Sequence, residues 1–150
     1  MQIKEVKPIN FLFYRAETKV NELERFIPIG QELYAEALKN KLSVTGPVHW
    51  HYFGFEGDEN KTFTLEVSLP VSHVVDEYDG KFHFKRTEKF RCVSTNHEGG
   101  WLEIPSTYGK LFQFIAENKL QPISANREIY VNVDFHQPDA NSTEIQIGIK

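Results

Sequence analysis

The sequence has few of the features that mark secreted, membrane-bound or nucleic-acid-binding proteins. Its single cysteine, Cys92, excludes an intramolecular disulfide and fits a reducing compartment. No apolar run approaches the length of a membrane span, and the N-terminus lacks the apolar segment of a signal peptide. No block or stripe of Lys and Arg is present, and the net charge is −4. We therefore expect a soluble, cytoplasmic protein with no direct nucleic-acid or membrane binding.

Motifs for metal, nucleotide and nucleophile chemistry are also missing. There is no glycine-rich phosphate loop, Walker pattern or nucleophile elbow. His49 and His51 have a spacing that can bind a metal from one strand face, but no carboxylate or cysteine cluster completes a site. Cys92 lacks the basic or helix-start setting of a reactive thiol, so we expect a small buried residue. The sequence predicts no metal site and no cofactor.

Aromatic residues are plentiful, with 12 Phe, 6 Tyr and 2 Trp, which make up 13% of the 150 residues. They supply ring surface for a core or a cavity. The stretch 126–135 alternates apolar and polar residues, the pattern of a half-buried strand. Glu128 and Tyr130 share one face of this strand, whose other face is apolar. They are either surface residues or the floor of a pocket.

An internal repeat favours the pocket. The order strand, helix, strand, hairpin, strand occurs in residues 1–75 and again in 82–150. The segment Asn40-Lys41-Leu42 ends the first predicted helix, and Asn118-Lys119-Leu120 ends the second, 78 residues later. Further pairs follow the same spacing within two residues: Trp50 with Glu128, Tyr52 with Tyr130, Leu33 with Leu111, Ile27-Pro28 with Ile104-Pro105, and Leu65, Val67 and Leu69 with Ile145, Ile147 and Ile149.

Each half has too few elements to cover both faces of its own sheet. We therefore predict a single α+β domain made of a duplicated β-α-β-β repeat. Two antiparallel sheets would face a central, barrel-like cleft, and one helix would back each sheet. The helix side would take Ile129, Val131 and Val133. The opposite side, which lines the cleft, would carry a carboxylate among aromatic rings, a setting typical of ligand sites: Trp50, Tyr52, Glu128 and Tyr130.

Several short segments, which together span nearly the whole chain, match a known pattern in order and spacing: 46–52, 97–101, 118–120, 127–130 and 143–147. With these segments the chain resembles the GyrI-like, or bacterial effector-binding, domain family. This domain also forms the ligand-sensing part of multidrug-responsive transcription activators. The family often has Gly-Pro-Tyr where this chain has Gly99-Gly100-Trp101. We expect Trp101 to supply a ring to the cleft.

The resemblance implies that the cleft binds a bulky, flat and often cationic organic molecule, with links to transcriptional regulation or drug resistance. The glutamate of the family's Glu-x-Tyr strand, here Glu128, would face the ligand between aromatic side chains. The implied ligand-binding residues are Glu128, Tyr130, Trp50, Tyr52 and Trp101. Because two repeats use up the 150 residues, we expect no attached helix-turn-helix domain.

Other interpretations stay open. Some family members are similar to hydrolases that open cyclopropane-containing electrophiles, in which case Glu128 would be the catalytic acid and base. Others act on proteins such as topoisomerases, so a protein partner or a homodimer is a further option. Tyr108, near the start of the second helix, either points into the cleft or only caps the sheet, and we favour capping.

Overall fold

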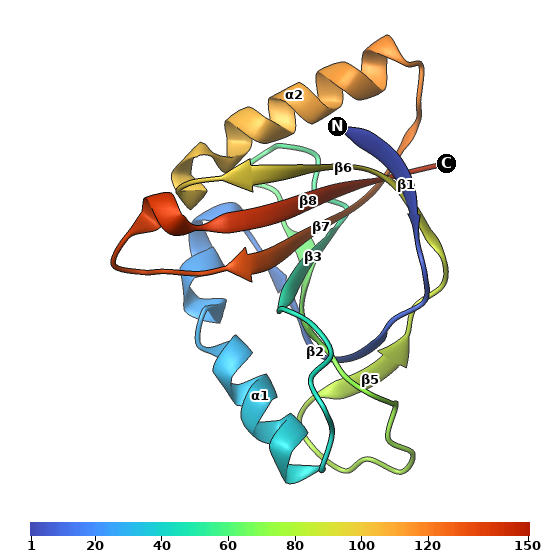
Figure 1. Cartoon of the computed structure of the whole chain (residues 1–150), viewed down its shortest axis with the longest axis vertical. Coiled ribbons are helices and arrows are strands. Elements are labelled where there is room, and N and C mark those ends of the chain that lie inside the picture. Colours follow the sequence, from blue (N-terminus) through green and yellow to red (C-terminus); the bar gives the residue numbers. More distant parts are fainter.

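The computed structural model describes residues 1–150 and shows two helices on an eight-stranded antiparallel sheet (Figure 1). The helices are α1 (Ile29–Lys39) and α2 (Ile104–Glu117), with short 3-10 segments η1 (Val20–Phe26), η2 (Trp101–Glu103) and η3 (Pro138–Ala140). The strands are β1 (Gln2–Val6), β2 (Asn10–Thr18), β3 (His49–Phe53), β4 (Phe63–Pro70), β5 (His83–Arg86), β6 (Phe90–Glu98), β7 (Pro122–Asn132) and β8 (Ser142–Ile149). Neither helix is long and apolar enough to cross a membrane.

The α+β class is confirmed, but the prediction of two separate sheets is wrong. The strands form one open sheet in the order β1-β6-β8-β7-β3-β4-β2-β5. The element order β2-α1-β3-β4 recurs as β6-α2-β7-β8, and the two units meet edge to edge where β3 pairs with β7. The edge strands are exchanged: β1 pairs with β6 of the second unit, and β5 pairs with β2 of the first. Hydrogen bonding between β3 and β7 thus merges the two expected sheets into one.

Both helices pack on the same face of this sheet. Leu33 and Ala37 of α1 are fully buried in a core with β2 and β4, and Leu111 of α2 is fully buried in a second core with β6 and β8. In Figure 1, α2 lies beside β6 and β8, while α1 lies at the opposite end of the sheet. The helices therefore leave the central strands β3 and β7 uncovered between them.

The sides of the strands were assigned the wrong way round in the sequence-based prediction. Residues directly opposite each other on neighbouring strands share a face. One such row is Val67, Trp50, Glu128 and Ile145, and its outer two members belong to the helix cores. Glu128 thus points to the helix side, and Ile129 points to the other. Alternation shows which residues share a face but does not show which face a helix covers.

The strand predicted at 126–135 is displaced toward the N-terminus. It runs from Pro122 to Asn132, with an irregularity between Tyr130 and Asn132. Val131 and Val133, which we expected under a helix, are 55% and 42% exposed. They lie outside both cores but on the helix side as predicted, where they border the open space between the helices.

Both helices end in the same way, which explains the repeated Asn-Lys-Leu segment. Lys41 and Lys119 adopt left-handed backbone angles, with φ of 58° and 54°. The next N–H, of Leu42 or Leu120, then donates to the carbonyl five residues back, at 2.9 Å in each case. This is a Schellman motif, which closes a helix and turns the chain back onto the core.

The face away from the helices carries a buried polar row. Glu66, His51, Arg127 and Gln146 lie opposite one another on β4, β3, β7 and β8, and all four are buried. Arg15 and Lys85 pair with Glu66. Large polar side chains therefore fill the side of the sheet that has no helix.

Candidate functional site

A cavity of about 1710 Å³ lies on the helix side of the sheet, over β3 and β7. The segments η1 and α1 border it on one side, and η2 and α2 border it on the other. All five residues predicted to bind ligand line it: Trp50, Tyr52, Trp101, Glu128 and Tyr130. The structure brings them together between the two helices, where we had expected the face opposite the helices.

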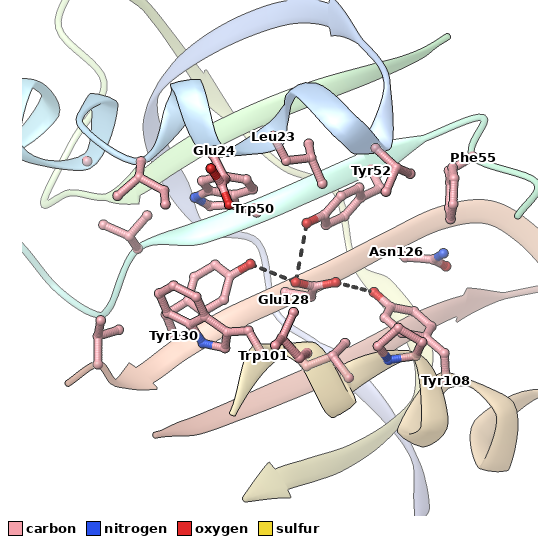
Figure 2. Close-up of a pocket in the computed structure, with 18 of the residues that line it drawn as sticks. Leu23, Glu24, Trp50, Tyr52, Phe55, Trp101, Tyr108, Asn126, Glu128 and Tyr130 are labelled. Atoms are coloured by element: carbon pink, nitrogen blue, oxygen red, sulfur yellow. Dashed lines mark hydrogen bonds between the residues drawn. The ribbon is translucent and has the colours of Figure 1, made fainter. Parts of the chain in front are cut away.

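Glu128 is the polar centre of the cavity floor, and three tyrosines donate hydrogen bonds to it (Figure 2). Tyr130 and Tyr52 donate to its Oε1 at 2.6 and 3.3 Å, and Tyr108 donates to its Oε2 at 2.7 Å. Glu128 is only 7% exposed and forms no salt bridge. The carboxylate is held in place by hydroxyl donors, and no lysine or arginine pairs with it.

Burial controls the ionisation of this cluster. It raises the pKa of Glu128 above its usual range, while the tyrosine hydrogen bonds work in the opposite direction. Burial and the nearby carboxylate raise the pKa of Tyr52, Tyr108 and Tyr130 well above the usual value. The phenols therefore stay protonated at neutral pH, so they can all donate to Glu128.

Tyr108 is the residue that the sequence-based prediction missed, since capping the sheet was the favoured interpretation and is wrong. The repeat could not identify it, because the position 78 residues earlier is Gly30 and has no ring. The helical spacing to Leu111, which is fully buried under α2, was the available signal. A residue three positions before a buried one lies near the same side of the helix and can reach the sheet.

Aromatic rings continue from the floor along one wall of the cavity. The ring centroids of Trp50 and Tyr130 are 5.9 Å apart, those of Tyr130 and Trp101 5.6 Å, and those of Trp101 and Phe135 5.6 Å. All three pairs meet edge to face, the arrangement that aromatic pairs favour. The wall therefore leads from the buried carboxylate toward the exposed Phe135.

His97 holds the segment that carries Trp101 and Tyr108. Its Nε2 lies 2.8 Å from the Gly100 carbonyl, and its Nδ1 lies 2.7 Å from the Thr107 hydroxyl. Nε2 donates to the carbonyl, which can only accept, while the Thr107 hydroxyl can either donate to Nδ1 or accept from it. Each contact is made next in sequence to one of the two aromatic residues. His97 is thus a positioning residue for this side of the cavity.

The cavity carries negative charge only. Of its 32 lining residues, 17 are hydrophobic and none is Lys, Arg or His. Four are glutamates, namely the buried Glu128 and the exposed Glu24, Glu56 and Glu59. A bound cation would be attracted by all four, and most strongly by the carboxylate that is shielded from water.

The other candidate residues lie on the opposite side of the sheet. His49 Nδ1 is 3.1 Å from His51 Nε2, and both rings pack edge-on against Phe11. Burial lowers the pKa of His49 to about 3, so the pair is neutral. Cys92 is fully buried, and burial raises its pKa to about 11, as befits a structural thiol.

Comparison with known proteins agrees with this architecture. The family model described as the GyrI-like small molecule binding domain matches residues 1–150. No curated protein sequence matches the chain at a significant level.

Solved structures share the fold at low sequence identity. The C-terminal domain of EcmrR has a TM-score of 0.84 at 19% identity, over 99% of this chain and 96% of that one. SAV2435, solved with bound tetraphenylphosphonium, has a TM-score of 0.66 at 12% identity, over 99% and 93%. A hydrolase from Listeria innocua has a TM-score of 0.69 at 17% identity, over 99% and 91%. These similarities establish the fold that surrounds the cavity.

Proposed function

Because the chain belongs to the family of GyrI-like small molecule binding domains, we propose that its cavity binds a bulky aromatic organic cation. The observation that carries this proposal is the buried Glu128, which accepts hydrogen bonds from three neutral phenols and forms no salt bridge. A buried charge is costly unless it is paired, and a ligand cation would complete the pair. The bound tetraphenylphosphonium of SAV2435 has this chemistry.

The aromatic wall suits the same ligand. Trp50, Tyr130 and Trp101 present ring faces and edges within one cavity, and a delocalised cation gains cation–π attraction there of about 0.5–2 kcal/mol per ring. The apolar lining favours a ligand whose charge is covered by hydrocarbon. We propose that the protein sequesters such compounds or reports their presence to a partner protein, as in drug resistance or regulated transcription.

Binding of a matched pair of compounds tests the proposal. Glu128→Gln keeps the shape of the side chain and removes its charge. We expect it to weaken tetraphenylphosphonium binding at least about tenfold, or 1.4 kcal/mol, by calorimetry. Binding of neutral triphenylphosphine oxide should change little. Equal losses for both compounds would show that Glu128 does not act through its charge.

Hydrolysis is the second candidate, favoured by the raised pKa of Glu128 and its contact with three phenols. A carboxylate with a pKa nearer neutrality can take a proton from water and return it. With a cyclopropane-containing electrophile, the water oxygen would bond to one ring carbon as the ring bond breaks. Glu128 would pass the proton to the other carbon, so that one water is consumed.

Turnover separates the two functions. Hydrolysis predicts ring-opened product from an activated cyclopropane, and its formation stops in Glu128→Gln while binding of the intact compound persists. Tyr108→Phe is a milder variant, since it removes one donor from Oε2 and leaves the carboxyl group. Product formation at the wild-type rate in Glu128→Gln would rule out this mechanism.

A further inference from the structure

Each helix that borders the cavity has a glycine on its cavity side. Gly30 is in the first turn of α1, and Gly109 is inside α2. Both line the cavity, and each is followed one turn later by a partly exposed aromatic residue that also lines it, Tyr34 and Phe112 respectively. The two glycines therefore lie in the two opposing walls of the site.

The backbone does not require glycine at either place. The glycines with left-handed angles are Gly54, Gly57 and Gly99, so Gly30 and Gly109 have angles that any residue adopts. Within a helix, glycine is less favourable than alanine, because it has more freedom to lose on folding. Local structure alone would favour a side chain at both positions.

Packing does not require glycine there either. A Cβ atom built on Gly109 has no heavy atom within 4 Å. A Cβ on Gly30 would meet only Val48, with its Cγ2 atom at an ordinary contact distance of 3.7 Å. By contrast, a Cβ on Gly148 would lie 2.7 Å from the Ala125 carbonyl oxygen, so that glycine is needed for packing. Because they have no side chains, Gly30 and Gly109 leave space free in the walls of the cavity.

We propose that Gly30 and Gly109 are specificity-determining residues that keep the cavity wide enough for cations carrying several rings around the charge. The inference rests on the proposed function, in which the cavity binds an aromatic cation. Side chains at these positions would narrow the space between α1 and α2 without touching Glu128. Tetraphenylphosphonium would then be excluded, while a slender cation such as benzyltrimethylammonium would still reach the carboxylate.

Melting temperatures without ligand test the first step. Gly109→Ala should raise Tm by about 2 °C, because alanine is the better helix residue and meets no neighbour. Gly30→Ala, in the first turn, should melt no lower than the wild type. A fall in Tm for either variant would mean that the glycine serves the fold, and would overturn the proposal.

Binding tests the second step with Gly30→Leu and Gly109→Leu. We expect each variant to bind tetraphenylphosphonium at least about tenfold more weakly and benzyltrimethylammonium within about twofold of the wild type. Ala35→Leu and Ala116→Leu are the matched controls, since each adds a leucine to an exposed helix position that does not line the cavity. Unchanged tetraphenylphosphonium binding in the glycine variants, or equal loss of both cations, would contradict the inference.

Neutral triphenylphosphine oxide distinguishes a failure of width selection from a failure of charge recognition. If Glu128→Gln weakens the cation and the neutral compound equally, the charge partner is wrong, and the glycine variants still report width through the neutral compound. If the leucine variants bind both wide compounds as the wild type does, width selection is wrong while charge recognition stands. A wild-type protein that binds neither wide compound would overturn the width proposal directly.

Discussion

Glu128 and Arg127 are consecutive residues that point to opposite faces of the sheet, and each buries a charge that no salt bridge neutralises. Arg127 has its guanidinium 3.9 Å from the centre of the Phe90 ring, which compensates part of its burial. Glu128 has only neutral hydroxyl groups. The difference suits a structural role for the arginine and a ligand-binding role for the glutamate.

Glu128→Gln should stabilise the free protein at neutral pH. The folded state holds the Glu128 proton more tightly than the unfolded chain, because burial raises its pKa. The contribution of this group to stability is therefore greatest below the ordinary carboxyl pKa of 4.5 and is lost as pH rises through the raised value. We expect the variant to have a higher Tm than the wild type at pH 7, and the two Tm values to become equal near pH 4.5. For a chain of this length, a difference of 1 kcal/mol in stability shifts Tm by about 2–4 °C.

Tyr130→Phe is the control for that measurement, because it removes the shortest hydrogen bond to the carboxylate and leaves the charge. It should lower Tm at pH 7. If Glu128→Gln melts below the wild type at every pH, the three hydrogen bonds outweigh the cost of burying the charge.

The His49–His51 pair has the opposite effect on stability: it should make the folded protein less stable as the pH falls. Burial, and then the positive charge of Arg127, lower the pKa of His49 to about 3. Unfolded histidine binds a proton near pH 6.5, so the folded state loses stability as pH falls below that value. One imidazole contributes about 2 kcal/mol of this loss by pH 5.

Chemical denaturation at pH 7 and pH 5 measures the effect. The double variant His49→Gln/His51→Gln keeps two polar groups that can bond to each other and removes both titrating rings. We expect its unfolding free energy to change less between the two pH values than that of the wild type. An unchanged pH dependence would place the acid sensitivity in other groups.

At the scale of the elements, the sequence predicted two helices ending at 40–42 and 118–120, and the structure ends them at Lys39 and Glu117, because helical periodicity is a local signal. The repeat spacing also brought four residues together, and all four line one cavity, because matching positions in two copies of a unit have similar surroundings: Trp50, Tyr52, Glu128 and Tyr130. Long-range pairing was not predictable in this way. The two units exchange β1 and β5, and β3 pairs with β7. These pairings depend on hydrogen bonds between segments that lie far apart in the sequence.

The helix ends allow a prediction of their own. Lys41 and Lys119 hold left-handed backbone angles, which cost a non-glycine residue about 1 kcal/mol. Lys41→Gly and Lys119→Gly should each stabilise the protein by about 0.5–1 kcal/mol, as measured by urea denaturation. Lys39→Gly, inside the last turn of α1, is the matched control and should destabilise it by a similar amount. Destabilisation by Lys41→Gly would show that the lysine side chain contributes more than the backbone costs.

At the scale of the whole molecule, the exchanged edge strands make each half depend on the other. Strand β1 of the first half pairs with β6 of the second half, and β5 of the second half pairs with β2 of the first. The α1 core also takes in Phe82, which comes from the start of the second half. The cavity is shared in the same manner, because Tyr52 comes from one half and Glu128 from the other. We therefore propose that the 150 residues form one folding unit.

Cleavage of the chain in the exposed segment at residues 76–77 tests this unity. The fragments 1–76 and 77–150 each contain one helix and four strands, but each lacks the strand that covers its edge. We expect neither fragment alone to unfold cooperatively, and the mixture to regain a single transition together with tetraphenylphosphonium binding. A mixture made with Glu128→Gln in the second fragment should regain the transition and not the binding. Cooperative unfolding of either isolated fragment would show instead that the repeat is two autonomous units, joined only where β3 meets β7.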